Sequence, residues 1–249
     1  ADFRDILEHE ERVFGIIKDE SREIVEKFGD ERKTEISAVI GSVDDEDLIP
    51  VEECILTLTN MGYMKRMTVD TYKAQNRGGR GIMGMSRREE DVAKTMFSCS
   101  SHDMVFLFTN TGKVFRKKAY EIPASSRTGK GMNVVNLLPL EKGETVSAMV
   151  KIPQDESRRY LCMVTKKGVI KRTDIDEYRH IRQSGIIAVN LDEGDELAYV
   201  EITDGNRKLV VATHNGMSIC FNESDARLIG RTARGVRAIT LDEDDYVVG

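Results

Sequence analysis

Four stretches of this chain repeat one arrangement of apolar and polar residues. Each stretch begins with an apolar run, passes through a polar turn that contains glycine, and continues into a second run that mixes apolar and basic residues. Short apolar runs on either side of a glycine turn predict two antiparallel strands joined as a β-hairpin. The four predicted hairpins cover residues 55–67, 105–117, 161–173 and 209–221.

Each hairpin is followed by the same further elements. A polar loop leads to a third apolar segment, an acidic turn comes next, and a fourth apolar segment ends the unit. Four short strands that recur about every 50 residues are typical of blades arranged radially, and one blade alone has nothing to cover its apolar faces. We therefore predict an all-β, propeller-like domain. Its third strands are expected at 81–86, 131–137, 185–191 and 235–241, and its fourth strands at 92–99, 145–152, 197–203 and 246–249.

Glycines mark the register of the repeat. In each copy one glycine lies in the hairpin turn and a second closes the polar loop, and the interval between them is 19 residues in three copies and 17 in the other. The loops between these marker glycines should therefore lie at equivalent places in the fold. The pairs are Gly62 and Gly81, Gly112 and Gly131, Gly168 and Gly185, and Gly216 and Gly235.

The first 36 residues follow a helical period instead. Apolar residues recur at steps of seven and four, so they share one helical stripe that would dock against a neighbouring helix. We expect the helix to end near Gly29. The stripe consists of Ile6, Val13, Ile17, Ile24 and Phe28.

Residues 36–49 read as a strand, an acidic turn and another strand, like the second half of a repeat. They predict half a blade that requires a complement from later in the chain. Because the sequence stops just after the last strand of the fourth copy, we expect a domain truncated at its C-terminal end. The predicted division is a helical segment over 1–36 and a β-domain over 37–249.

Charge follows the repeat. The chain carries a formal net charge of −6, yet the windows between the marker glycines carry +4, +5, +1 and +1 in chain order. In a radial assembly these windows lie on one rim, so we expect a basic band there, with the acidic turns elsewhere. A solvated charged face without function is the alternative. The expected contacts in the band are Lys65, Arg66, Lys113, Arg116, Lys117, Arg127, Lys130, Arg172, Arg182, Arg231 and Arg234.

The loop at residues 75–81 reads QNRGGRG. Arg77 and Arg80 supply fixed charge, and glycine lets the backbone take positive φ and approach a bulky anion closely. This combination predicts contact with a nucleic-acid backbone. The candidate residues are Gln75, Arg77, Gly78, Gly79, Arg80 and Gly81.

Other chemistry finds little support. Gly79, Gly81 and Gly84 match a dinucleotide fingerprint, but polar residues precede them and no helix pattern follows, so we set that interpretation aside. The four cysteines lie singly in or beside predicted strands and are expected to be reduced core thiols. We identify no catalytic residues and no metal ligands, and no apolar run has the length of a membrane span.

The loop QNRGGRG resembles the gyrase A box, whose family pattern is QRRGGKG, and residues 16–36 resemble the end of the dimer-gate coiled coil of the A subunits of bacterial DNA gyrases. Arg80 replaces a lysine of the pattern and keeps its charge, whereas Asn76 replaces an arginine and loses one. The resemblance covers the whole chain.

It implies a six-bladed β-pinwheel in the cytoplasm that wraps duplex DNA around its rim and so directs ATP-dependent negative supercoiling. It also implies that the partners are DNA, the B subunit of the enzyme and the rest of the A subunit, in an assembly of two A and two B chains. The catalytic tyrosine and the sites that use ATP and Mg²⁺ would lie in other parts of that enzyme.

Two alternatives stay open. The first is the C-terminal domain of the A-type subunit of topoisomerase IV, which has the same fold and wraps DNA more weakly. The second is a propeller-like module that binds an acidic protein through the basic band. Supercoiling by the assembled enzyme separates the first from gyrase, and a steep salt dependence of duplex binding would argue against the second.

Overall fold

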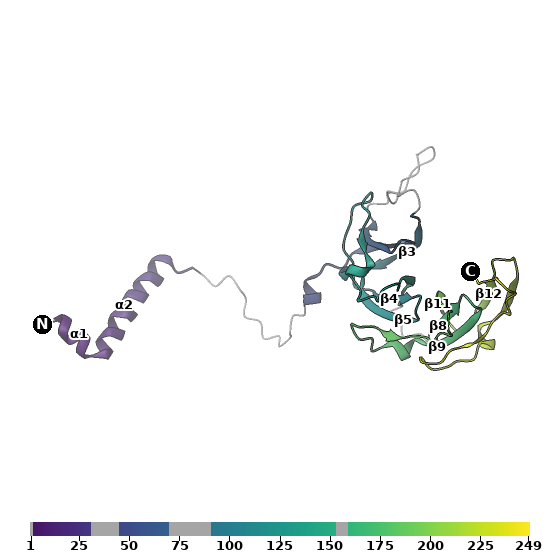
Figure 1. Ribbon diagram of the computed structural model, residues 1–249. Coiled ribbons are helices and arrows are strands. Elements are labelled where there is room, and N and C mark those ends of the chain that lie inside the picture. The colour runs from purple at the N-terminus through teal and green to yellow at the C-terminus, as the bar shows by residue number, and fades with distance from the viewer. Residues whose placement is uncertain (1, 31–44, 70–90, 153–158) are drawn as a thin grey trace. The chain divides into compact units, whose positions relative to one another are not determined.

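The computed structural model describes residues 2–30, 45–69, 91–152 and 159–249 (Figure 1). The chain divides into two compact units, residues 1–48 and residues 49–249. The predicted boundary after residue 36 lies outside the described residues, and so does the first strand of the predicted half blade. Asp45–Leu48 forms a 3-10 turn, so the second strand of the half blade, expected near Leu48, is not formed.

Residues 2–30 form two α-helices where one was expected. Helix α1 spans Asp2–Glu8 and α2 spans Glu10–Phe28. His9 separates them, because its backbone is extended (φ −122°, ψ 102°). The predicted end near Gly29 is confirmed, since Gly29 caps α2. Among the described residues nothing covers the apolar side of α2, where Ile24 and Phe28 are 60% and 79% exposed.

The second unit is built from strands, and the four predicted hairpins are confirmed. The hairpin strands are β1 (Glu53–Thr59) with β2 (Tyr63–Thr68), β4 (Met104–Thr109) with β5 (Lys113–Lys118), β8 (Tyr160–Thr165) with β9 (Val169–Asp174), and β12 (Lys208–Ala212) with β13 (Ser218–Asn222). Predicted fourth strands form β3 (Ala93–Ser100), β7 (Val146–Lys151) and β11 (Leu197–Thr203). In the last copy this segment makes a single bridge, between Thr213 and Val247.

The three third strands that the structure describes differ from the prediction in length and in place, and the one expected at 81–86 lies outside the described residues. They are β6 (Met132–Asn133), β10 (Ile186–Ile187) and β14 (Val236–Arg237), each only two residues long. Each one pairs with the hairpin of the preceding copy and not with its own, so the sheets run β3-β1-β2-β6, β10-β5-β4-β7 and β11-β8-β9-β14. A sheet therefore combines three strands of one copy with one strand of the next, and this exchange links neighbouring blades.

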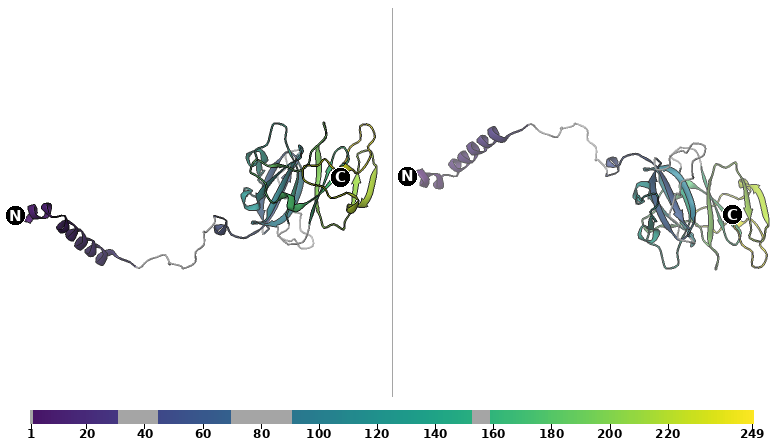
Figure 2. Two further views of the ribbon diagram at one scale, coloured as in Figure 1. Left: turned by 90° about the horizontal axis from the view of Figure 1, so that it is seen from below. Right: turned by 90° about the horizontal axis from the view of Figure 1, so that it is seen from above.

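The four sheets follow one another along an arc (Figure 1), and views from below and above show them side by side (Figure 2). In the third sheet β11 lies nearest the inside of the arc, followed outward by β8 and β9. The short third strands and the loops that precede them pair beyond β2, β5 and β9, which places them on the outer, convex side of the arc.

The second sheet is buried on both faces. Val105 and Leu107 of β4 pack into a core with Leu56 of the first sheet, whereas Phe106 and Phe108 of the same strand pack into a second core with sheet three. This explains why the hairpin strands are almost continuously apolar. The last sheet has no following blade among the described residues, and Cys220 on β13 is exposed. The prediction of core thiols is thus wrong for Cys220 and confirmed for Cys54, Cys99 and Cys162, which are free and buried.

Two features shape the hairpin turns: the positive φ of the marker glycines and hydrogen bonds from the turns to carboxylates of the acidic turns. Every marker glycine that the structure describes has φ between 76° and 113°. The last carboxylate of each acidic turn folds back onto the hairpin turn of its own copy. Asp91, Asp195 and Asp245 accept backbone N–H groups of Met61, Lys167 and Asn215 at 3.0–3.1 Å.

In the second copy Glu144 takes the place of the aspartate, and its longer side chain contacts both the hairpin turn and the acidic turn. It accepts the Thr111 hydroxyl at 2.7 Å and the Glu141 backbone N–H at 2.9 Å. Burial by itself raises the pKa of Glu144, but these hydrogen bonds, one from Thr109 and the Lys113 charge together lower it below its ordinary value of 4.5. The ionised carboxylate therefore stabilises the turn.

We expect Glu144→Gln to lower the free energy of unfolding by about 1 kcal/mol at pH 7, since a charged acceptor is lost. A carboxylate with a lowered folded-state pKa stabilises the protein above pH 4.5, and this contribution is lost as pH falls through the folded pKa. The variant should therefore lose less stability than the parent between pH 5 and pH 3, in urea unfolding at about 0.5-unit steps. Glu193→Gln in the exposed turn of the third copy is the control, and identical pH profiles for parent and Glu144→Gln would contradict the assignment.

Candidate nucleic-acid interface

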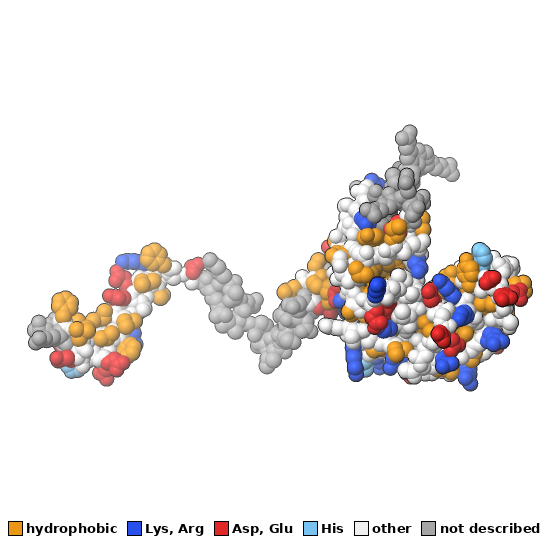
Figure 3. Space-filling view, viewed as in Figure 1, with side chains coloured by type: hydrophobic (Ala, Val, Ile, Leu, Met, Phe, Trp, Pro, Cys, Tyr) orange, Lys and Arg blue, Asp and Glu red, His pale blue; other side chains and the backbone are white. Residues whose placement is uncertain are grey.

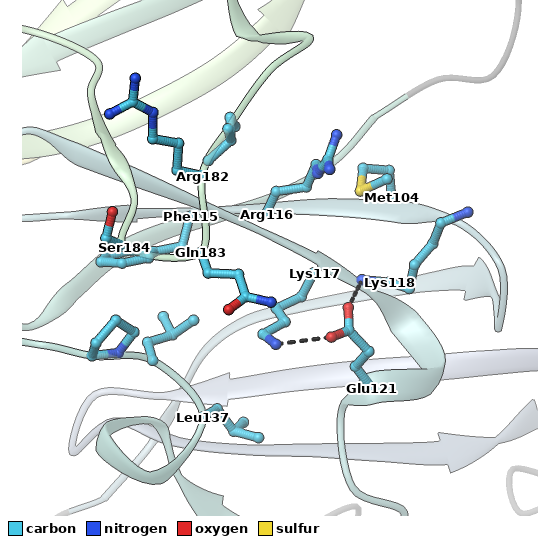
Figure 4. A pocket seen from close by; sticks show the side chains of 13 residues that line it. Met104, Phe115, Arg116, Lys117, Lys118, Glu121, Leu137, Arg182, Gln183 and Ser184 are labelled. Atoms are coloured by element: carbon cyan, nitrogen blue, oxygen red, sulfur yellow. Dashed lines mark hydrogen bonds and ion pairs between the residues drawn. The ribbon is translucent and has the colours of Figure 1, made fainter. Parts of the chain in front are cut away.

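Cations from neighbouring copies border a groove on the convex side, here called the β5 groove (Figure 4). Its volume is about 660 Å³. Arg116, Lys117 and Lys118 come from β5, and Arg182 comes from the loop of the next copy, which β10 fixes against β5. The groove is lined by Met104, Phe115, Arg116, Lys117, Lys118, Glu121, Leu137, Leu138, Pro139, Ile181, Arg182, Gln183 and Ser184.

A second groove of about 470 Å³, the β10 groove, adjoins the first. The two share Arg182 and Ser184, so they form one path that crosses from the second copy to the fourth. Lys and Arg side chains recur along the convex lower edge in Figure 3, with Asp and Glu among them. The β10 groove is lined by Lys113, His180, Arg182, Ser184, Gly185, Ile186, Ile187, Arg231 and Thr232.

The cations of this path differ in the ion pairs and hydrogen bonds that their charged groups already make within the protein. Arg182 is exposed and makes no ion pair with any residue that the structure describes, and Arg116 is exposed with one N–H on the Arg179 carbonyl at 3.1 Å. Lys117 contacts Glu121 at 2.8 Å, an interaction drawn in Figure 4. Arg231 donates to the Ile187 carbonyl at 2.6 Å. Arg116 and Arg182 therefore present the most available charge.

The expectation that the acidic turns lie away from the basic band is wrong at two places. Lys113 contacts Glu141 at 2.6 Å, which raises the pKa of Lys113, and Arg234 contacts Asp192 at 2.9 Å. The physical reason differs between the two pairs. The acidic turn of the second copy folds back onto its own hairpin and so reaches Lys113. The strand exchange, in contrast, brings the loop of the fourth copy, with Arg234, over the acidic turn of the third copy. Both pairs are partly exposed, so the attraction is weak and a phosphate could compete with it.

Two predicted contacts lie inside the domain. Lys65 is 1% exposed and its ammonium group binds backbone carbonyls, so its expected contact with a phosphate is wrong. The side chain of Arg172 is 12% exposed, stacks on the Tyr160 ring at 5.0 Å and lies 4.0 Å from Glu223. Sequence alone could not reveal this, because a cation in a mixed strand is ordinarily solvated.

Three further predicted contacts lie on the loop of the second copy or beside it. Arg127 and Lys130 are partly exposed, and the Lys130 ammonium lies 3.7 Å from the centre of the Tyr63 ring. Arg66 is partly buried and donates to the Ile122 carbonyl at 3.2 Å. Gln75, Arg77, Gly78, Gly79, Arg80 and Gly81 lie outside the described residues.

The expected DNA contacts did not include Lys118 and His180, which line the two grooves. Lys118 directly follows Lys117 in the most basic window, and that position was the available signal. Within the described ranges no group of three or more His, Cys, Asp or Glu side chains could hold a metal ion, and no helix is long and apolar enough to cross a membrane.

Known proteins resemble this chain over nearly all of it. It is 47% identical to the DNA gyrase A protein of Halalkalibacterium halodurans over 240 residues, which are 96% of the chain and 29% of that protein. Its fold matches a crystal structure of the C-terminal domain of DNA topoisomerase IV (TM-score 0.67, 30% identity, 81% of this chain and 61% of that one). It also matches a structure of the DNA gyrase A C-terminal domain (TM-score 0.62, 27% identity, 80% and 64%).

A sequence family described as DNA gyrase C-terminal domain, beta-propeller, matches residues 55–100, 103–153, 159–204 and 207–249. These four segments coincide with the four copies of the repeat, and together they exceed half of the chain. The expected all-β, propeller-like fold and the resemblance noted in the sequence are thus confirmed. The chain belongs to the family of DNA gyrase C-terminal domains.

Proposed function

We propose that residues 37–249 form the DNA-wrapping domain of the A subunit of a bacterial DNA gyrase, and that duplex DNA follows the convex rim. The observation that carries the proposal is the path through the β5 and β10 grooves. Cations of three successive copies border it, including Arg116, Arg182 and Arg231, and two of these are exposed. Repeated cations on a curved edge suit phosphates spaced along a bent duplex.

Electrostatics favours wrapping over recognition of a base sequence. Bending a duplex of 20–30 base pairs costs on the order of 1–6 kcal/mol, which many simultaneous phosphate contacts offset. Among the described residues of the second unit the helices are single 3-10 turns, so no helix there fits a major groove. In this proposal Gln75 to Gly81 form an anchor at one end of the wrapped segment.

The complete enzyme is part of the same proposal. Residues 1–36 would end the coiled coil of the dimer gate, and the exposed apolar side of α2 is consistent with such a partner. Two A and two B chains would assemble in the cytoplasm, and the wrapped DNA would be passed through a gate that uses ATP and Mg²⁺ elsewhere. Wrapping then fixes the sign of the crossing and favours negative supercoils.

The test is the salt dependence of duplex binding. Wild type should bind random-sequence duplexes with an affinity that falls steeply with salt, and Arg116→Ala with Arg182→Ala should remove two phosphate contacts and lower the slope of log K against log salt by about 1.8. Lys142→Ala with Lys208→Ala is the control, because both lysines are exposed and lie outside the basic windows. A shallow wild-type slope, or equal slopes for the two double variants, would refute this path.

The topoisomerase IV domain stays a second candidate, because its TM-score of 0.67 exceeds the 0.62 of the gyrase A domain. The two candidates differ in the reaction of the assembled enzyme. Gyrase introduces negative supercoils into relaxed plasmid with ATP, whereas topoisomerase IV relaxes and unlinks DNA. Net supercoiling by an enzyme that carries this domain would decide for gyrase.

A further inference from the structure

Two lysines of the second hairpin strands are buried beneath the rim. Lys65 on β2 and Lys171 on β9 are each the third residue after the turn glycine, and each is 1% exposed. An ammonium group in such a place requires hydrogen-bond acceptors. Both lysines find such acceptors in backbone carbonyls.

The carbonyls belong chiefly to the basic loop of the next copy. Lys65 Nζ donates to the carbonyls of Arg127 at 2.7 Å and Gly129 at 3.0 Å, with Ser126 at 3.4 Å. Lys171 Nζ donates to the carbonyl of Arg231 and, at 2.6 Å, to that of Ala188. Arg127 and Arg231 are equivalent, since each lies four residues before the glycine that closes its loop.

The residue after each lysine binds the same loop again. Arg66 pairs in parallel with Ala124, and its carbonyl accepts the Ser125 N–H at 3.0 Å. Arg172 pairs in the same way with Leu228, and its carbonyl accepts the Ile229 N–H at 3.0 Å. Each loop is thus hydrogen-bonded to two successive residues of the preceding copy, and these contacts lie close to the arginine of the loop.

The second copy provides an internal comparison. Phe115 occupies the position of the two lysines and is equally buried. The loop that follows it, before Gly185, is the shorter one and reads IRQSG, whereas the loops that follow the lysines read RTGKG (127–131) and RTARG (231–235). Within the described residues, each hairpin that has a buried lysine is covered by a loop of one type. That loop carries an arginine four places before its closing glycine and a second cation one place before that glycine.

We propose that Lys65 and Lys171 are positioning residues for DNA binding: each holds the backbone of the next copy's loop so that Arg127 with Lys130, and Arg231 with Arg234, face the duplex. This inference rests on the proposed function. The lysines themselves do not contact DNA. They act through the loop carbonyls, and a fixed loop does not lose conformational entropy when a phosphate binds.

Burying these ammonium groups does not favour folding by itself. Burial lowers the pKa of Lys171 to about 8, with the nearby Arg231 charge acting in the same direction and Glu177 opposing it, and burial lowers the pKa of Lys65 as well. Replacing a buried charge with an apolar side chain of similar volume is often neutral or stabilising. Phe115 demonstrates that the fold accepts an apolar residue at this position.

The experiment uses the full chain, a random-sequence duplex and the variants Lys65→Met and Lys171→Met. We expect an unchanged or raised Tm, faster amide exchange in residues 125–131 for the first variant and 229–235 for the second, and duplex affinity reduced roughly three- to tenfold. Leu58→Met is the control, because Leu58 is fully buried on β1 and lines neither groove, and it should leave both exchange and affinity unchanged. In an Arg127→Ala/Lys130→Ala background, Lys65→Met should cause less than about a twofold further loss, because the cations through which it acts are gone.

A full additional loss in that background, or unchanged exchange in the loop, would overturn the positioning role. If Lys65→Met unfolds, Lys65→Leu replaces it with a side chain of comparable volume. Lys171→Met provides the same two readouts, amide exchange and duplex affinity, at the second site. If wild type lacks salt-dependent duplex binding, the proposed function fails and the role toward DNA fails with it. The exchange measurement would then still report whether the lysine holds the loop.

Discussion

Replacing Arg77 and Arg80 together with alanine is expected to abolish negative supercoiling by the assembled enzyme, while DNA cleavage and ATP-independent relaxation continue. Both arginines lie in the loop QNRGGRG, the proposed anchor of the wrapped segment. Loss of about two phosphate contacts should lower the salt slope of binding by about two units. The functional loss should be larger, because a wrap without its anchored end loses the contacts that offset bending.

Supercoiling of relaxed plasmid with ATP, measured beside relaxation without ATP, tests this expectation. The exposed pair Lys142→Ala with Lys208→Ala removes the same formal charge outside the basic windows and should supercoil at the wild-type rate. If the Arg77 and Arg80 double variant also supercoils normally, the loop has no anchoring role.

Replacing Gly131 with alanine is expected to destabilise the domain by roughly 3 kcal/mol or more. Gly131 closes the loop of the second copy with φ +84°, and a Cβ there would lie 2.5 Å from the Met64 carbonyl oxygen and 3.0 Å from the Lys65 Cβ. The contacted atoms belong to Met64 and Lys65 of β2, which are 0% and 1% exposed, so the backbone of β2 or of the loop has to shift. The substitution should therefore separate β6 from β2 and break the link between the first two copies.

A substitution at Gly143 separates the energetic cost of the backbone conformation from the cost of steric overlap. This glycine has nearly the same φ, +86°, but nothing lies within 4 Å of a Cβ built on it. Gly143→Ala should therefore cost only about 1 kcal/mol. Urea unfolding of both variants gives the comparison, and equal losses would show that the close approach of β2 and the loop does not limit stability.

The local pattern of the chain was sufficient for the elements that local forces form. Apolar runs on either side of a glycine turn predicted the hairpins, because a hairpin is closed by neighbouring residues, and the marker glycines predicted positive φ before any partner was known. The basic windows likewise predicted that Arg116 and Arg182 would be exposed.

Pairing between distant segments was decided only in three dimensions. The third segments β6, β10 and β14 are too short to specify a partner by their own pattern, and only the packing of consecutive blades assigns each to the preceding hairpin. The break at His9 was equally invisible, because the helical stripe continues in register across it from Ile6 to Val13.

The positions of the cations show the same difference between what the local sequence and the tertiary structure determine. Lys65 and Lys117 have similar neighbours in sequence, yet Lys117 lies at the edge of the β5 groove, whereas Lys65 is covered by the loop of another copy whose carbonyls bind its charge. By itself, the sequence determined the repeat, the hairpins and the family. The tertiary structure alone decided which charges face solvent, because that depends on contacts between neighbouring copies, made by residues 64 to 70 positions apart in the sequence.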